Sequence, residues 1–165
     1  MDVVAWVSES TWPACLAALR DHVPSGARVT LLYVADDEVP AIARGALAGL
    51  LGRSRAAGPD PAARVRELAG AAGRELLDTA SRQAGREVAL DLRHGRVERE
   101  VVAAAASCDL LVVARDGDLS RLGPHSLAPA TRFVVDHAPC AVLLVWPSTP
   151  PAIGSIPPPP LQEAR

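Results

Sequence analysis

The stretch CDLLVVARDGDLSRLGPHSLAPATRFVVDHAPCAVLLVW, residues 108–146, holds two short apolar runs separated by a polar, glycine-containing segment. The runs Leu110 to Ala114 and Ala141 to Trp146 are continuously apolar, which is typical of strands that are covered on both faces. Between them, Ala130 to His137 has helical spacing and ends just before Pro139, which disfavours helical geometry in the residue that precedes it. The stretch therefore predicts a strand, a crossover helix and a parallel strand.

The rest of the chain continues this alternation. Val3 to Val7 and Val29 to Val34 are two further apolar runs that predict strands. Glu87 to Leu92 alternates polar and apolar residues, as an edge strand with one wetter face does. Residues 12–23, 61–84 and 97–106 carry helix-like patterns between the strands. We expect an α/β fold with a parallel sheet.

One domain, residues 1–147, accounts for this pattern, and two further segments lie within it or beyond it. Residues 36–60 form an insertion whose 41–51 part has a composition typical of a short helix. The insertion is either a lid over the sheet edge or an element that contacts a partner. Residues 148–165 are rich in proline and have no apolar periodicity, so we expect a disordered tail.

Composition excludes several classes of function. The net charge is −2 and the isoelectric point is about 6.1, so we expect no nucleic-acid partner. All 17 basic residues are arginine, which excludes a P-loop lysine and Schiff-base chemistry. No apolar stretch is long enough to span a membrane, and no signal peptide is recognisable, so we expect a cytoplasmic protein that does not contact membranes.

The sequence also contains no pattern that indicates a reactive cysteine, a metal site or a hydrolase. Cys15, Cys108 and Cys140 lie far apart in the sequence, within or beside apolar segments, and are interpreted as reduced core residues. The histidines lack the spacing of a zinc enzyme, and the acidic run at residues 36–38 has no recognisable partner cluster. No serine lies in the turn motif of a hydrolase. We expect no metal site and no catalytic residue.

A ligand site is expected where parallel sheets of this type bind small molecules. In open α/β sheets, ligands bind beyond the carboxyl ends of the strands, where the strand order reverses. The loops after Val7, Val34 and Ala114 are therefore the candidates. The loop at residues 115–129 contains glycine and leads into a helix, a combination that can hold phosphate through backbone N–H groups and the helix dipole.

The run Asp109 to Val113, with His137 to Cys140 entering the final strand, resembles the C-terminal signature of the universal stress protein family. Val29 to Val34 is similar to that family's second strand. The resemblance implies a three-layer sandwich with a five-stranded parallel sheet, which is dinucleotide-fold-like and adenine nucleotide alpha hydrolase-like. It also implies a homodimer formed through the last strand, Ala141 to Trp146. Some members of the family bind ATP and others do not.

The resemblance also implies positions for a nucleotide, and several of these have changed. Val7 stands where the family has an adenosine-contacting aspartate, and Val34 matches the apolar residue beside adenine. Ser120 replaces the second glycine of the phosphate loop. Ala128-Pro129 replaces a Gly-Ser pair, and proline has no backbone N–H to offer a phosphate. The candidate nucleotide contacts are Val7, Val34, Ala114, Arg115, Gly117, Ser120, Gly123, His125, Ser126, Ala128, Pro129 and Thr131.

Three hypotheses for function follow. The first is a non-enzymatic stress-response protein that binds ATP or another adenine nucleotide through this degenerate motif. In that case Arg115, Arg121, His125 and Ser126 replace the missing anion donors. The second is a dimeric scaffold of the same fold that needs no nucleotide and acts through an unknown protein partner. The third is slow ATP hydrolysis or phosphoryl transfer, which requires positioned metal ligands and cations.

Overall fold

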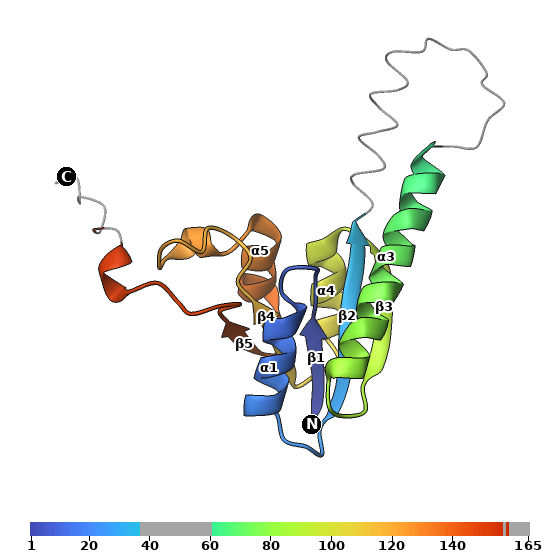
Figure 1. The fold of residues 1–165 in the computed structure, drawn as a ribbon, viewed down its shortest axis with the longest axis horizontal. Helices are drawn as coiled ribbons and strands as arrows, with labels where there is room; N and C mark the ends of the chain where they lie inside the picture. Colours follow the sequence, from blue (N-terminus) through green and yellow to red (C-terminus); the bar gives the residue numbers. More distant parts are fainter. Residues whose placement is uncertain (37–60, 157, 159–165) are drawn as a thin grey trace, which may run out of the picture.

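A single parallel sheet of five strands organises the computed structural model, which describes residues 1–36, 61–156 and 158. The strand order is β3-β2-β1-β4-β5, so the first strand of the chain lies at the centre (Figure 1). The strands are β1 (Asp2–Trp6), β2 (Arg28–Asp36), β3 (Ala89–Gly95), β4 (Leu110–Ala114) and β5 (Ala141–Val145). The fold class expected from the sequence is confirmed.

Helices cover both faces of the sheet and make it a three-layer sandwich (Figure 1). The helices are α1 (Trp12–His22), α3 (Pro61–Gln83), α4 (Val97–Ala105) and α5 (Pro129–His137), and two 3-10 turns are η1 (Pro124–Ser126) and η2 (Ile153–Ser155). Leu19 of α1 and Leu77 of α3 pack on one face of the sheet. Val101 of α4 and Val134 of α5 pack on the other.

The continuous apolar runs follow from this two-sided burial. Val3 and Ala5 of β1 pack with α1 and α3, while Val4, which points the opposite way, packs with α4 and α5. All three are less than 9% exposed. A strand at the centre of such a sandwich has no wet face, so no polar residue interrupts its sequence. No helix among the described residues is long and apolar enough to cross a membrane.

The edge strand β3 lies further along the chain than the alternation predicts. Its expected range was Glu87 to Leu92, whereas it runs from Ala89 to Gly95. The register with β2, from Thr30 opposite Ala89 to Asp36 opposite Gly95, extends the strand through Arg93 and His94. Charged residues are tolerated in β3 because none of its residues is buried, so their side chains reach solvent from the faces of the strand.

The two appended segments are described only in part. The predicted helix at 41–51 lies outside the described residues, as do residues 157 and 159–165 of the tail. Residues 148–156 were expected to be disordered, yet they include the turn η2. Within it, Ser155 Oγ donates to Ala152 O at 2.7 Å and accepts a hydrogen bond from Leu122 N at 3.0 Å. This side chain ties the start of the tail to the loop that follows β4.

Candidate functional site

The carboxyl ends of β1 and β4 meet at the point where the strand order reverses. The chain passes from β1 outward to β2 on one side, and from β4 to β5 on the other. The crevice between them measures only about 50 Å³, far below the roughly 300–1,000 Å³ of small-molecule sites. It is lined by Trp6, Ser8, Thr11, Val113, Ala114, Asp116 and Thr131. An adenosine does not fit inside it.

The loop after β4 folds back on itself and satisfies its own backbone groups. Gly117 N donates to Ser126 O at 3.0 Å, and Asp118 N donates to His125 O at 2.8 Å. A Cβ at position 117 would overlap the carbonyl oxygen of His125, so only glycine allows this approach. The N–H of Gly117, which was expected to bind phosphate, therefore already has a partner.

A carboxylate from the same loop lies at the N-terminus of α5. Asp116 Oδ1 accepts a hydrogen bond from Ala128 N at 3.0 Å, and its Oδ2 accepts one from Thr131 Oγ1 at 2.7 Å. Ala128 is the N-cap residue of the helix, and Thr131 is buried in its first turn. A helix N-terminus favours negative charge because its N–H groups and dipole point outward there. Asp116 provides that charge from within the chain.

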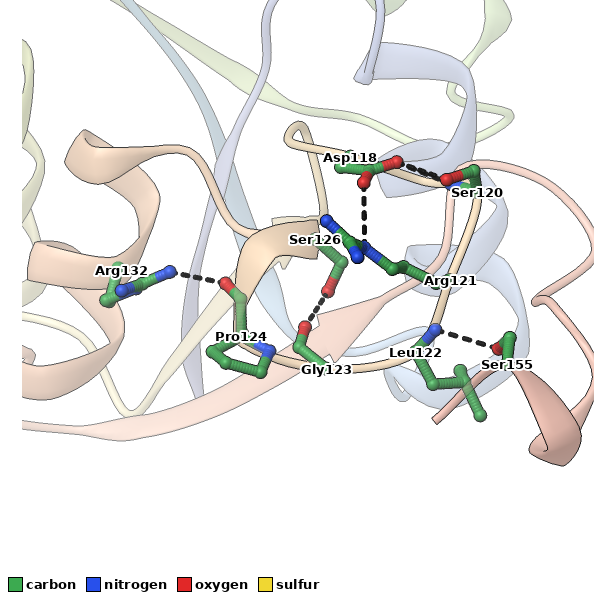
Figure 2. Close-up of polar contacts among 9 residues, drawn as sticks. All are labelled: Asp118, Ser120, Arg121, Leu122, Gly123, Pro124, Ser126, Arg132 and Ser155. Atoms are coloured by element: carbon green, nitrogen blue, oxygen red, sulfur yellow. Dashed lines mark hydrogen bonds and ion pairs between the residues drawn. The ribbon is translucent and has the colours of Figure 1, made fainter. Parts of the chain in front are cut away.

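The middle of the loop is held by a second carboxylate, Asp118 (Figure 2). Asp118 Oδ1 accepts hydrogen bonds from Ser120 N at 3.0 Å and from Ser120 Oγ at 2.5 Å. Its Oδ2 pairs with Arg121 Nε at 3.1 Å. The hydrogen bond from the Ser120 hydroxyl is the largest cause that lowers the pKa of Asp118 below its usual value, and Arg121 adds to it. Ser120 and Arg121 therefore bind a carboxylate of the loop itself.

Arg115 ties the two halves of the loop to the end of the sheet. Its Nη1 donates to Ser126 Oγ, and its guanidinium lies 4.8 Å from the centre of the Trp146 ring. Ser126 is fully buried, and its hydroxyl also donates to Gly123 O at 2.6 Å (Figure 2). A cation over an aromatic ring and a charged hydrogen bond both favour one fixed position of this side chain.

Two open grooves lie beside the crevice and share the start of α5. One of about 500 Å³ separates the end of β2 from the N-terminal ends of α4 and α5. The other, of about 710 Å³, follows the outer side of α5. The first is lined by Asp36, Arg96, Val97, Glu98, Ala128, Pro129, Ala130 and Phe133, and the second by Gly117, His125, Leu127, Ala128, Pro129, Arg132, Phe133, Asp136 and His137.

Several side chains that line these grooves contact one another or the backbone. Phe133 and His137 stack with their ring centres 4.0 Å apart. Arg132 Nη2 donates to Pro124 O at 2.5 Å (Figure 2), which fixes the 3-10 turn η1 against α5. Arg96 Nε pairs with Glu98 at 3.0 Å. The grooves therefore offer a flat, partly apolar surface beside the helix N-terminus.

The predicted site residues fall into two groups in the structure. Val7, Val34 and Ala114 are 1%, 7% and 3% exposed and belong to the core, with Val7 N donating to Leu32 O at 2.9 Å. The residues of the loop and of the start of α5 come together, but largely through bonds to one another. Asp116 was not among the predicted residues. One sequence feature could have pointed to Asp116. It is an acidic residue two positions after a strand, and it precedes a helix whose N-cap residue, alanine, has no side-chain acceptor.

Within residues 1–36, 61–156 and 158, no group of three or more histidine, cysteine, aspartate or glutamate side chains lies close enough together to hold a metal ion. Of the acidic run at 36–38, only Asp36 belongs to this part of the chain, and it ends β2 at the rim of a groove.

Comparison with solved structures finds the same architecture. A universal stress protein family protein from Arabidopsis thaliana with AMP bound is 18% identical, with a TM-score of 0.57 over 90% of this chain and 93% of that one. The universal stress protein UspA from Lactobacillus plantarum is 22% identical, with a TM-score of 0.56 over 87% and 96%. A universal stress protein in complex with cAMP is 20% identical, with a TM-score of 0.52 over 90% and 98%. At these identities the likeness shows the fold.

Sequence comparison assigns the family. No curated protein matches the chain significantly. The model of the universal stress protein family, in contrast, matches residues 3–145, which include the four described helices in full and all of the sheet except Asp2. The resemblance at residues 109–113 and 137–140 is thereby confirmed, and the chain belongs to the universal stress protein family.

Proposed function

We propose that this chain is a non-enzymatic regulatory protein of the universal stress protein type that acts through protein contacts and does not use ATP as its ligand. One observation supports this most directly: the carboxylate of Asp116 lies where the helix α5 would receive a phosphate. The small crevice between β1 and β4, of about 50 Å³, agrees with it.

The electrostatic argument follows from Coulomb's law. A phosphate placed at the start of α5 would lie beside a fixed negative charge, which costs about 1 kcal/mol at 4 Å in water and more in a drier site. The backbone N–H groups of Gly117 and Ala128 already donate to oxygens of the chain. Pro129 has no N–H to offer. A triphosphate would have to displace these bonds in order to bind.

The surface that we propose for protein contacts includes β5, which would pair with β5 of a second copy of the chain. β5 is the last strand of the sheet, and residues 142–146 are only partly buried. An apolar edge strand is prone to pair with another strand, and a twofold pairing of residues 141–146 removes that liability. A monomer mass by light scattering at micromolar concentration would contradict the dimer without affecting the argument about Asp116.

A second candidate is the binding of an adenine nucleotide that carries little phosphate charge. Two structures of the same fold were solved with AMP and with cAMP. The groove of about 500 Å³ between β2 and the starts of α4 and α5 is large enough for a nucleoside. This ligand would lie beside Asp116 and would not replace it.

Calorimetry on nucleotide-stripped protein separates the two candidates. ATP and AMP are titrated separately in the presence of magnesium, and a mass spectrum of the untreated protein tests for nucleotide carried through purification. The scaffold proposal expects no heat at millimolar ATP and no co-purified nucleotide. Micromolar ATP binding would refute it, and AMP binding without ATP binding would favour the second candidate.

The absence of enzymatic activity is tested in the same samples. We expect no phosphate release from ATP above the level of a blank that lacks protein. Under the third hypothesis, slow hydrolysis, loss of the loop cation Arg115 or Arg121 should reduce the rate. Phosphate release by the native protein that falls in Arg121→Ala would show that this chain is an enzyme.

A further inference from the structure

Two of the three cysteines meet at the amino ends of neighbouring strands, although they lie 32 positions apart. Cys108 Sγ and Cys140 Sγ are 3.7 Å apart, and both residues are half-buried. Because Leu110 pairs with Ala141, Cys140 is offset from Cys108 by one residue across the parallel pair. Strand spacing and rise then place their Cα atoms about 6 Å apart, which is within the range of natural disulfides.

The third cysteine has a different environment. Cys15 is 0% exposed in the core on the opposite face of the sheet, where its thiol donates to Trp6 O at 3.3 Å. Burial raises the pKa of this thiol to about 12. Cys108 and Cys140 instead pack at the margin of the core beneath α4 and α5. The sequence predicted three reduced core cysteines, and this one fits the prediction most closely.

We propose that Cys108 and Cys140 form an oxidation site, in which exchange with a low-molecular-weight disulfide joins them in an intramolecular bond. One thiolate attacks a sulfur of the small disulfide and releases one small thiol. The other cysteine then attacks the mixed disulfide and releases the second small thiol. The two protein thiols lose two electrons and two protons, and the small disulfide gains both.

The local environment sets the rate of this exchange. Desolvation, the largest cause, and the neighbouring Cys140 together raise the pKa of Cys108 to about 11. The thiolate is the nucleophile, so a thiol with this pKa is almost wholly unreactive near neutral pH. Attack by the Cys108 thiolate is therefore slow at pH 7 and becomes faster as the pH rises.

The bond would join the edge strand β5 covalently to the interior strand β4. It closes a loop of about 33 residues, which constrains the unfolded chain and raises the unfolding temperature by on the order of ten degrees. The inference does not depend on the proposed function, because the pair lies at the opposite end of the strands from the loop that contains Asp116.

The test is a thiol count on the full chain. Protein is incubated at pH 8 with glutathione disulfide, quenched in acid, unfolded, alkylated and weighed by mass spectrometry. We expect the native protein to lose two alkylatable thiols and keep one, and a non-reducing digest to show residues 108 and 140 linked. Unfolding of the oxidised protein should occur at a higher temperature than that of the reduced protein.

Three variants make the result specific. Cys15→Ala should leave no alkylatable thiol after oxidation, which shows that Cys15 takes no part. Cys108→Ala and Cys140→Ala should each stop at a mixed disulfide with glutathione and show no thermal shift on oxidation. Three alkylated thiols in the native protein, a bond that includes Cys15, or a covalent dimer through Cys140 would each overturn the proposal. Circular dichroism of the reduced variants checks that they are folded.

Discussion

Replacement of Asp116 should change two properties in opposite directions. Asp116→Ala removes the acceptor for Ala128 N and Thr131 Oγ1 at the start of α5. Loss of such a cap costs about 1 kcal/mol, which lowers the unfolding temperature of a chain of this size by about 2–4 °C. The same change removes a negative charge from the anion position, which favours phosphate by about 1 kcal/mol, or roughly fivefold in affinity.

Denaturant unfolding and calorimetry with inorganic phosphate measure the two effects. The midpoint of unfolding should fall with no change in its dependence on denaturant, while phosphate binding strengthens. Asp116→Asn keeps an acceptor oxygen without the charge, so it should retain most of the stability and still gain affinity. Asp136→Ala removes an equal charge near the C-terminal end of α5 and should gain no phosphate affinity, because Asp136 lies far along the helix from Ala128.

Two results would refute this reasoning. An unchanged unfolding midpoint in Asp116→Ala would mean that the carboxylate does not cap α5. Equal phosphate affinity in the native protein, Asp116→Ala and Asp116→Asn would mean that this helix terminus is not an anion position, and the argument against ATP would then lose its main support. A gain in Asp136→Ala as large as that in Asp116→Ala would indicate a general effect of net charge.

Three further changes probe other parts of the fold. Gly117→Ala should destabilise the protein by about 1–3 kcal/mol, since its Cβ would overlap the backbone of His125, and denaturant unfolding measures this. Arg86→Met removes hydrogen bonds to four carbonyls of the turn after α1, so the unfolding midpoint should fall, whereas Arg82→Met on the exposed end of α3 should change it little. Tyr33 is the only tyrosine, and burial raises its pKa to about 12. Its ultraviolet titration should occur near pH 12 when folded and near pH 10 when unfolded, with stability lost between these values; a folded titration near pH 10 would contradict this.

The sheet could be predicted because its signal is local. Each central strand is a run of apolar residues that no charge interrupts, and burial on both faces requires this at residues 3–5 and 111–113. The position of β3 could not be obtained in this way. Its range depends on the register with β2, which carries the strand on through Arg93 and His94, and pairing of distant segments leaves no mark on the local pattern.

The sequence predicted the location of the candidate site but not the contacts of its side chains. The loop after β4 and the start of α5 do come together at the carboxyl end of the sheet, as parallel topology requires. The roles of the side chains depend on how the loop folds back. Asp116 caps a helix whose N-cap residue lies twelve positions later, and Arg115 reaches Ser126 across the loop. These contacts depend on how the loop folds in space. The presence of cationic residues in the sequence does not indicate them.

The central position of β1 has a consequence for how the chain folds during synthesis. Val3 pairs with Val29 on one side and with Leu110 on the other, so one edge of β1 stays open until more than a hundred further residues have been made. Pairings between segments so distant in sequence form slowly, and an unpaired apolar strand invites association with other chains. During synthesis we therefore expect the N-terminal half of this protein to be the part most prone to association with other chains until β4 emerges.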